Sequence, residues 1–454
     1  MTSDSTSPQQ LSADIAIVGW GKAGKTFAGR AAQAGKKVIL IERDSGMIGG
    51  ACINVACIPT KALLHSATLG PGNSAAPEYF QEAIAARDAL TAKLNSANRK
   101  MLVDADGVTI VMGQAEFLEP KKLRVDTGSG ESLIVGAETV IINTGSAPRR
   151  LDVPGAQLPH VHDSITIQHL SALPRSLAIV GGGVVALEFA QMFASFGAAV
   201  TIIARGDLLA DAEPELRELF LERLSAAGVR LISGAEVREV SATAVHTNQG
   251  EVAADAVLVA IGRVPNLPEG TAEVGIALDK RGFVAVDEHL RSSVSGVYAA
   301  GDANGGPQLT YISLDDSRIL AAELLAAPSR TTADRRAVPQ VIFGELPFAS
   351  VGLSEAAARA QGLNVAVAVK DVADLAMVPR PKTLGKTAGR VKVVVDSDTD
   401  TIVGFSHLGV DAQEVVNVVA LAMRMGARVS DLRDGIWLHL STTELLNEIF
   451  NTLH

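Results

Sequence analysis

The 454-residue sequence contains only two cysteines, and aromatic residues make up only 4% of it. So few cysteines exclude the disulfide framework that stabilises small secreted domains. One cysteine pair without a second pair also supplies only half of a structural zinc site. A redox-active pair is therefore the favoured interpretation, with two unrelated buried thiols as the alternative. Because catalytic disulfides are the kind found in reducing compartments, we expect a cytoplasmic protein.

The sequence also lacks an excess of basic residues and any long apolar run. Its 40 basic residues are outnumbered by 50 acidic ones, and the net charge of −10 argues against nucleic-acid or anionic-membrane partners. No apolar run reaches the roughly 18 residues that a membrane-spanning helix needs. Residues 1–13 are polar and are expected to form a disordered tail. The length predicts two or three domains, and the 42 glycines are typical of an α/β protein with few aromatics.

The two cysteines, Cys52 and Cys57, are five residues apart. In a continuous α-helix this spacing separates the Cα atoms by roughly 8–9 Å, which exceeds the limit of roughly 7 Å for a disulfide. A disulfide therefore requires a distorted backbone near the start of a helix, where Pro59 is acceptable. Cys57 would then lie at the positive end of that helix, which favours its thiolate.

A nucleotide-binding pattern precedes the cysteines. An apolar strand at 14–18 leads into a glycine turn, a helix to about residue 34 and a strand at 37–41, which ends at Glu42. Glycines in such a turn let the backbone approach a pyrophosphate at the helix N-terminus, and the acid accepts a hydrogen bond from a ribose hydroxyl. The alternative is a glycine-rich turn without a ligand. The three glycines are Gly19, Gly21 and Gly24.

The same pattern returns 162 residues later, since Gly181 follows Gly19 by that offset. A strand at 177–180, a helix to about residue 196 and a strand at 199–203 surround the second turn. Two such units predict two dinucleotides. The offset that gives Glu42 in the first unit gives Ala204 in the second, followed by Arg205. A guanidinium instead of a carboxylate favours the 2′-phosphate of NADPH over NADH; an ordinary solvated arginine is the alternative.

These segments together resemble the flavin-dependent pyridine nucleotide–disulfide oxidoreductases, the family of lipoamide dehydrogenase, glutathione reductase and mercuric reductase. The resemblance covers residues 14 to about 450. It implies an α/β fold with two Rossmann-like domains, which bind FAD and NAD(P)H, and a C-terminal α+β dimerisation domain. The implied FAD-binding domain comprises 14–149 and 270–335, the NAD(P)H-binding domain 150–269, and the interface domain of a homodimer 336–454. In the last of these, strands are expected at 340–343, 349–352, 365–369, 391–395 and 402–406.

The resemblance also assigns roles to individual residues. Electrons pass from NADPH through FAD to the disulfide; Cys57 faces the flavin and Cys52 is the exposed sulfur that reacts with the substrate. His439, oriented by Glu444, reaches into the active site of the partner subunit and manages the proton there. The remaining catalytic pair is Lys61 with Glu188. The residues implied to contact the two dinucleotides are Gly19, Gly21, Gly24, Lys25, Glu42, Arg43, Gly50, Lys61, Ala115, Thr144, Gly145, Gly181, Gly183, Val184, Val185, Glu188, Arg205, Gly262, Arg263, Gly301 and Asp302.

Three residues depart from the family pattern. Ala56 stands where glycine is usual, Val184 where many relatives carry a tyrosine that covers the flavin, and Leu440 where proline is usual. Because Leu440 replaces this proline, the sequence does not fix the direction from which His439 approaches the active site. For Glu444 the alternative is a capping box with Ser441, and for His439 a surface loop position. His160, His162 and His169 are interpreted as surface residues, so no metal site is expected.

The substrate is constrained by two further observations. Mercuric reductases end in a cysteine pair, which the terminal residues 450–454 lack. Residues 21–26, 114–117 and 310–319 resemble the reactive-chlorine-resistance flavoproteins, which are associated with reduction of hypothiocyanous acid or copper(II). A small oxidant is therefore the expected substrate. The alternatives are a mercuric reductase-like metal reductase, a lipoamide dehydrogenase-like subunit of a dehydrogenase complex, and a flavin-bearing sensor without turnover.

Overall fold

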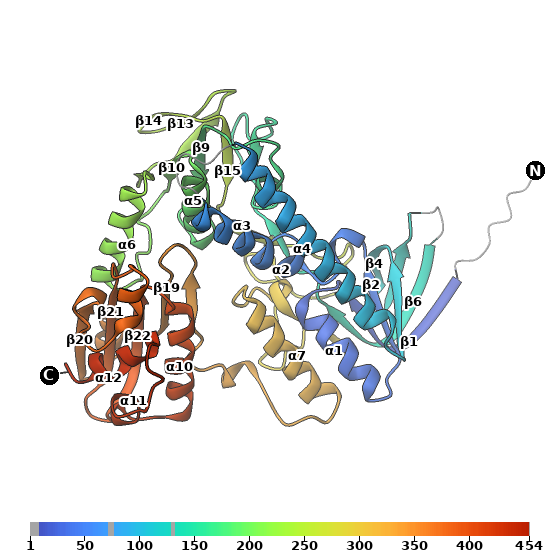
Figure 1. The fold of residues 1–454 in the computed structure, drawn as a ribbon. Helices are drawn as coiled ribbons and strands as arrows, with labels where there is room; N and C mark the ends of the chain where they lie inside the picture. The colour runs from blue at the N-terminus through green and yellow to red at the C-terminus, as the bar shows by residue number, and fades with distance from the viewer. Residues whose placement is uncertain (1–8, 71–76, 129–131, 454) are drawn as a thin grey trace, which may run out of the picture. The chain divides into compact units, whose positions relative to one another are not determined.

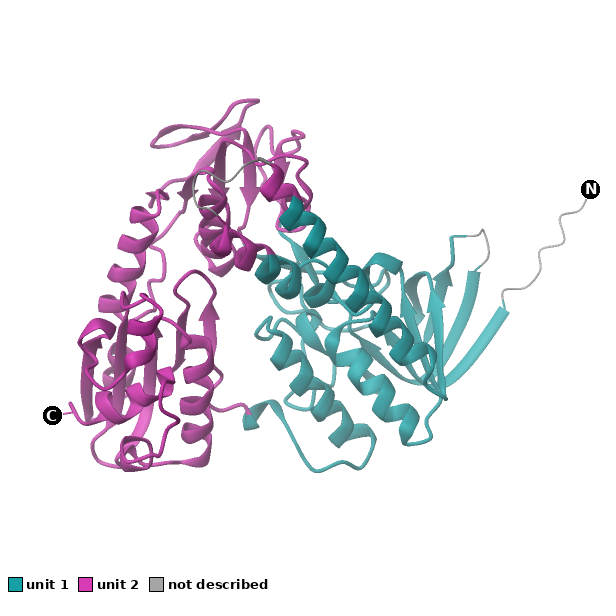
Figure 2. Cartoon of the chain, in the orientation of Figure 1, with its two compact units in different colours: residues 1–62, 82–149, 262–334 teal, residues 63–81, 150–261, 335–454 magenta. Residues whose placement is uncertain are grey.

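The computed structural model describes residues 9–70, 77–128 and 132–453. The chain divides into two compact units, which are described separately (Figure 2). Unit 1 comprises residues 1–62, 82–149 and 262–334, and unit 2 comprises residues 63–81, 150–261 and 335–454. Residues 1–8 of the expected tail lie outside the described residues. So does most of the segment 70–77, whose sequence GPGNSAAP predicts a loop.

Unit 1 is built on a seven-stranded sheet in the order β3-β2-β1-β6-β5-β4, with β17 paired to β6. Strands β1, β2, β3, β6 and β17 pair in parallel, whereas β4, β5 and β6 form an antiparallel meander. Helices α1 and α7 pack side by side beneath it (Figure 1). The strands are β1 (Gln9–Val18), β2 (Val38–Glu42), β3 (Val108–Met112), β4 (Gln114–Glu119), β5 (Lys122–Asp126), β6 (Ser132–Ile142), β7 (Ser146–Pro148), β16 (Arg263–Pro265) and β17 (Val297–Ala299).

The helices of this part of the chain are α1 (Lys22–Gln33), α2 (Ala51–Asn54), α3 (Cys57–Leu69), α4 (Pro77–Val103) and α7 (Thr310–Leu324). The apolar face of α1, including Ala23, Phe27 and Ala31, is fully buried against the sheet. That burial fixes the helix N-terminus at the carboxyl end of β1, where a parallel sheet places its ligand site.

Two expected boundaries differ from the structure. The tail predicted to extend to residue 13 instead contributes residues 9–13 to β1, where they pair with residues 133–137 of β6. Backbone pairing needs no apolar side chains, so the polar composition was misleading. The chain also returns to unit 1 at Gly262 rather than at residue 270, because β16 pairs with β7 within that unit.

The first part of unit 2 repeats the strand–turn–helix arrangement. Its parallel sheet runs in the order β11-β10-β9-β15-β8, and a three-stranded antiparallel sheet follows β11 in the chain. Its helices are α5 (Val184–Phe196) and α6 (Pro214–Ala226). The strands are β8 (Val161–His162), β9 (Ser176–Val180), β10 (Ala199–Ile203), β11 (Arg230–Ile232), β12 (Val237–Val240), β13 (Ala244–Thr247), β14 (Gly250–Ala253) and β15 (Ala256–Val259). Of the three histidines interpreted as surface residues, His169 is exposed, whereas His160 and His162, the latter in the edge strand β8, are half-buried.

The second part of unit 2 is an antiparallel sheet in the order β18-β19-β22-β21-β20, covered by α10 and α12. All five predicted strands are confirmed: β18 (Gln340–Ile342), β19 (Phe348–Gly352), β20 (Val365–Asp371), β21 (Arg390–Asp396) and β22 (Thr401–Leu408). The helices are α8 (Glu355–Ala360), α9 (Pro379–Thr383), α10 (Ala412–Met425), α11 (Val429–Arg433) and α12 (Leu445–Phe450). Apolar side chains of the sheet, α10, α11 and α12 form the main core, and Ala358 of α8 packs in a smaller cluster with Val365 and Val394.

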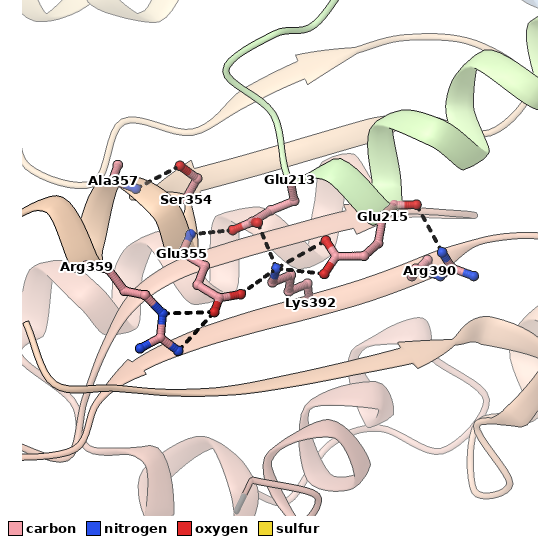
Figure 3. Close-up of polar contacts among 8 residues, drawn as sticks. All are labelled: Glu213, Glu215, Ser354, Glu355, Ala357, Arg359, Arg390 and Lys392. Carbon is pink, nitrogen blue, oxygen red and sulfur yellow. Dashed lines mark hydrogen bonds and ion pairs between the residues drawn. The ribbon is translucent and has the colours of Figure 1, made fainter.

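A buried ion cluster ties α6 to this sheet within unit 2 (Figure 3). Lys392 of β21 is only 2% exposed, and its Nζ lies 2.8 Å from Glu213, 3.1 Å from Glu215 and 2.9 Å from Glu355. Burial alone would lower the pKa of Lys392, but the three hydrogen-bonded carboxylates outweigh it and raise the pKa. The lysine is therefore held in its charged form.

Across the residues that the structure describes, every helix is too short or too polar to cross a membrane.

Candidate functional site

The cysteine pair lies at a break between two helices. Helix α2 ends at Asn54 and α3 begins at Cys57, so the continuous helix that would separate the sulfurs is absent, as their spacing requires. Both cysteines are free thiols in this structure. Ala56 donates its N–H to Ala51 O at 2.8 Å and is not among the residues with positive φ. The position therefore does not require the glycine that is usual in the family.

The two thiols have opposite acidities. The hydrogen bond from the Cys52 thiol, with help from Thr310 and the charge of Lys61, lowers the pKa of Cys57 to about 6 in spite of burial. The same hydrogen bond and burial raise the pKa of Cys52. Cys57 also occupies the first residue of the 13-residue helix α3, where the helix dipole favours a negative charge. The geometry therefore makes Cys57 a thiolate at neutral pH and keeps Cys52 protonated.

Thr310 was not identified as a site residue from the sequence. Its Oγ1 lies 3.3 Å from the Cys57 sulfur, and it is the first residue of α7. The segment 310–319 was noted only for its resemblance to relatives. A hydroxyl at the start of a predicted helix was the available signal, but nothing local connects it to a cysteine 253 residues away.

The first glycine turn is shaped for a close ligand approach. Gly19 has a φ of 99°, and a β-carbon there would lie 2.5 Å from Asn143 O. Asn143, which the sequence did not single out, accepts from Gly24 N at 2.8 Å and donates to Ala300 O at 2.8 Å. Gly21 caps the 12-residue α1 without a side-chain hydrogen bond, so the first N–H groups of α1 face the turn. This cradle fits a pyrophosphate.

Five of the predicted cofactor residues line one pocket in unit 1: Gly19, Glu42, Arg43, Ala115 and Thr144. Glu42 is buried at the end of β2, where its carboxylate accepts from Trp20 N at 2.9 Å and Asp44 N at 3.1 Å. Arg43 donates to Asn266 Oδ1 at 3.3 Å, and Asn266, which was not predicted, also lines the pocket. A pocket with an acid at the strand end is suited to a nucleoside.

A hydrogen-bond cluster around Ser146 connects further predicted residues. Its hydroxyl donates to Asp302 Oδ2 at 2.7 Å and accepts from Arg263 Nε at 2.6 Å. Arg263 also donates to the Ser146 carbonyl at 2.6 Å. The turn that carries Asp302 is fixed by buried Asp316, which accepts from Gly301 N at 2.6 Å. Ser146 and Asp316 escaped sequence analysis because their role depends on contacts between distant segments. The flanking predicted glycines are Gly145 and Gly262, both with positive φ.

The second glycine turn repeats the geometry of the first. Gly181 has a φ of 128°, and a β-carbon would lie 2.2 Å from Ala260 O. Gly183 caps α5, whose first two residues, Val184 and Val185, are 46% and 39% exposed. Arg205 follows β10 and is exposed, while the preceding Ala204 is buried. This second cradle also fits a dinucleotide, with a guanidinium at the position where a ribose would lie.

Two other predicted residues, Glu188 and Lys25, have defined contacts. Glu188 is buried and accepts from Phe343 N at 3.0 Å. Lys61 belongs to unit 1 and Glu188 to unit 2, so their pairing remains a prediction. Lys25 donates to Gly49 O at 2.9 Å and to Asn98 Oδ1 at 2.6 Å. Burial, with the nearby charge of Lys22, lowers the pKa of Lys25 to about 8. The hydrogen bond of Lys25 to Gly49 O holds the segment that leads to Gly50.

His439 and Glu444 form a hydrogen-bonded pair. Nδ1 of His439 lies 2.9 Å from Glu444 Oε1, and the side chains are 74% and 14% exposed. The other carboxylate oxygen accepts from Leu440 N at 3.0 Å. The capping-box alternative is wrong, because Ser441 makes no side-chain cap and Glu444 accepts from Leu440 rather than from Ser441. Among the described residues no peptide bond is cis; Leu440 instead has a φ of 70°.

Comparison with known proteins agrees with this arrangement. Residues 13–316 match the pyridine nucleotide-disulphide oxidoreductase family, and residues 338–449 match the dimerisation domain of the same family. The chain therefore belongs to the pyridine nucleotide-disulphide oxidoreductases, a family of flavoprotein oxidoreductases, and carries their dimerisation domain.

Among curated relatives, the chain is 38% identical to the probable pyridine nucleotide-disulfide oxidoreductase RclA of Escherichia coli, over 96% of this chain and 98% of the relative. It is 30% identical to mercuric reductase of Staphylococcus aureus, over 95% and 80% of the two chains, and 31% identical to dihydrolipoyl dehydrogenase of Geobacillus stearothermophilus, over 96% and 95%. The solved structure of the HOCl-induced flavoprotein disulfide reductase RclA from E. coli in complex with Cu(II) matches with a TM-score of 0.92 at 37% identity, covering 97% of this chain and 99% of that one.

Proposed function

We propose that this protein is an FAD- and NADPH-dependent disulfide reductase that reduces a small oxidant, such as hypothiocyanous acid, through Cys52 and Cys57. The observation that carries the proposal is the cysteine pair at the break between α2 and α3, where Cys57 begins α3 and its sulfur lies 3.3 Å from the Thr310 hydroxyl. The hydrogen bond between the two thiols lowers the pKa of Cys57 and raises that of Cys52. RclA of E. coli is described as an HOCl-induced flavoprotein disulfide reductase. The similarity of this chain to RclA therefore supports an oxidant as substrate.

The residues present fit the two dinucleotides. Gly19, Gly21 and the N-terminus of α1 would hold the FAD pyrophosphate, and Glu42 its ribose. Gly181, Gly183 and the N-terminus of α5 would hold the second dinucleotide. When bound, the flavin supplies two-electron transfer between the nicotinamide and the disulfide. The remaining predicted contacts belong to this proposal in the same way: Gly24, Lys25, Arg43, Gly50, Lys61, Ala115, Thr144, Gly145, Val184, Val185, Glu188, Gly262, Arg263, Gly301 and Asp302.

The chemistry of the cysteines follows from their acidities. Cys52 attacks the sulfur of hypothiocyanous acid and forms a sulfenyl thiocyanate, while the departing oxygen leaves as water. The Cys57 thiolate then attacks the Cys52 sulfur and displaces thiocyanate, which closes the disulfide. One dithiol with one negative charge and one hypothiocyanous acid give one disulfide, one thiocyanate and one water. In the proposed homodimer, His439 of one subunit, oriented by Glu444, serves the active site of the other subunit, where it takes the Cys52 proton and passes it to the departing oxygen.

Arg205 carries the proposed preference for NADPH. Its exposed guanidinium follows β10 at the position where an NADH-specific site has an acid. A guanidinium is well suited to a 2′-phosphate because it donates several hydrogen bonds to one anion.

The proposed functional unit is a homodimer in the cytoplasm. The match to a dimerisation domain supports the homodimer. So does the pair of exposed apolar side chains beside His439, in which Ile436 and Leu438 are 101% and 81% exposed, because a second subunit would cover this surface.

The proposal is tested by measuring oxidant-dependent NADPH consumption by the purified holoenzyme with hypothiocyanite, copper(II), mercury(II) and lipoamide in turn. We expect hypothiocyanite to support the fastest turnover, and Cys52→Ser to abolish it. Copper(II) is the second candidate because the matching structure of RclA is a Cu(II) complex. Turnover of hypothiocyanite that survives in Cys52→Ser would contradict the proposal. Faster turnover of lipoamide or mercury(II) would assign the chain to another branch of the family.

A further inference from the structure

The turn that carries His439 has a backbone conformation that is unfavourable for its sequence. Ser441 donates its N–H to Leu438 O at 3.3 Å, so residues 438–441 form a four-residue turn with His439 and Leu440 at its centre. Leu440 has a φ of 70°. A positive φ at the third residue is typical of a type II turn, in which glycine or asparagine is preferred. Leucine is disfavoured there because of its β-carbon.

The two oxygens of Glu444 are used by two different donors. Oε1 lies 2.9 Å from Nδ1 of His439, and Oε2 accepts the backbone N–H of Leu440 at 3.0 Å. An ionised carboxylate has no proton to donate, so the proton of the first contact belongs to Nδ1 of His439. In the neutral ring Nε2 then carries the lone pair and is the atom that can accept a proton. The two contacts together fix the plane of the carboxylate.

We propose that the backbone N–H of Leu440, presented by this left-handed turn, is a positioning group for the His439–Glu444 pair. The inference rests on the proposed acid–base role of His439. Proline, which is usual in the family at this position, has no N–H. This chain therefore orients its glutamate by a contact that the usual residue cannot make, and it retains a strained leucine conformation in doing so.

Substitutions at this position separate the N–H from the side chain. Leu440→Pro removes the donor and forces a negative φ. Leu440→Gly and Leu440→Asn retain the donor and tolerate a positive φ. We expect Leu440→Pro to slow reduction of the oxidant on the order of tenfold or more, since misplacement of a catalytic group has effects of that size. Glycine and asparagine should retain the wild-type rate.

Glu444→Gln serves as the comparison within the pair. Glutamine has one oxygen for two N–H donors, so either His439 or Leu440 loses its acceptor. We expect this variant to resemble Leu440→Pro. Ile436→Pro is the comparison for proline in the same segment, at a side chain that is 101% exposed. It alters the proposed subunit surface but leaves the Leu440 N–H in place, so it should retain the Nδ1-protonated ring of His439 even where dimerisation is affected.

The experiment uses the flavin-loaded protein and separates the two halves of the reaction. Anaerobic reduction by NADPH should keep its rate in Leu440→Pro, whereas kcat for hypothiocyanite falls without a matching rise in the KM for NADPH. Nitrogen-15 histidine NMR should show an Nδ1-protonated ring at His439 in wild type, Leu440→Gly and Leu440→Asn, but not in Leu440→Pro. Oxidant reduction at the wild-type rate in folded Leu440→Pro would overturn the inference.

Two further measurements keep the test decisive. If Leu440→Pro does not fold, hydrogen exchange of the Leu440 amide replaces it: exchange should be slow in wild type and accelerated in Glu444→Ala, and equal rates would overturn the inference. His439→Gln distinguishes the two proposals. A slow His439→Gln with a normal Leu440→Pro removes only the positioning role, whereas a normal His439→Gln removes the acid–base role and the inference with it.

Discussion

The hydroxyl oxygen of Thr310 lies 3.3 Å from the sulfur of Cys57, and each residue is the first residue of its helix. The hydroxyl and the N-terminus of α3 both favour a negative charge on the sulfur. The Cys52 thiol adds the strongest hydrogen bond to this thiolate. Two helices that begin far apart in the sequence therefore converge on one reactive atom.

Removing the Thr310 hydroxyl is expected to raise the pKa of Cys57. Thr310→Val has nearly the same shape but cannot donate a hydrogen bond, and loss of a hydrogen bond to a charged group costs about 1.5 kcal/mol, which is roughly tenfold in the ionisation constant. The thiolate absorbance of the reduced protein, followed against pH, measures the change. Thr310→Ser retains the hydroxyl and should titrate as wild type; an unchanged titration in Thr310→Val would exclude this role.

The reduced protein should become more stable as the pH rises from about 6 to 9. The pKa of Cys57 is lowered from 9.0 to about 6 in the folded state, so between these values the unfolded chain binds more protons than the folded one. Stability then increases with pH, and the contribution is lost as the pH falls through 6. Chemical denaturation of reduced wild type and reduced Cys57→Ser at several pH values checks this. Equal pH dependence of the two proteins contradicts it.

Loss of the buried charge at Lys392 should be strongly destabilising. Lys392→Met leaves Glu213, which is 3% exposed, without its cation, and removal of one partner from a buried ion cluster costs about 3–5 kcal/mol. The measurement is the free energy of unfolding. Lys122→Met is the control, because its ion pair with Glu119 has exposed side chains (44% and 66%) and should contribute less than about 1 kcal/mol. Similar losses of unfolding free energy in both variants would show that the buried cluster contributes no more to stability than an exposed ion pair.

Reversing the charge at Arg205 should change the choice of nicotinamide. Loss of charge-assisted hydrogen bonds worth about 1.5–3 kcal/mol lowers kcat/KM for NADPH by roughly 10- to 100-fold in Arg205→Glu, and the new carboxylate can accept from the 2′-hydroxyl of NADH. Steady-state kinetics with both coenzymes measure the ratio. Arg238→Glu, at another exposed position of unit 2, should leave the ratio unchanged. A constant ratio in Arg205→Glu would remove the basis for the NADPH preference.

The sequence predicted those features that depend on local backbone rules. Gly19 and Gly181 are needed because a β-carbon would collide with the neighbouring strand end, and the strands on either side show as short apolar runs. The break between Cys52 and Cys57 follows from their spacing in the same way.

The sequence could not show contacts that depend on the packing of distant segments. Asn143 links the first glycine turn to Ala300 across 157 residues, and Thr310 reaches Cys57 across 253. The extra residues at the start of β1 were missed because the backbone of β6, rather than their own side chains, stabilises them. The Leu440 turn was missed because a positive φ at leucine runs against its preference.

The most direct test of the account is anaerobic titration of the flavin-loaded protein with NADPH, followed by its visible spectrum. The central claim is that Cys52 and Cys57 receive the electrons before the oxidant does. In wild type the first equivalent of NADPH should produce a long-wavelength band from the Cys57 thiolate beside an oxidised flavin, and hypothiocyanite should then remove that band. Bleaching of the flavin by the first equivalent, with no such band, would contradict the claim because the two cysteines would not be coupled to the flavin.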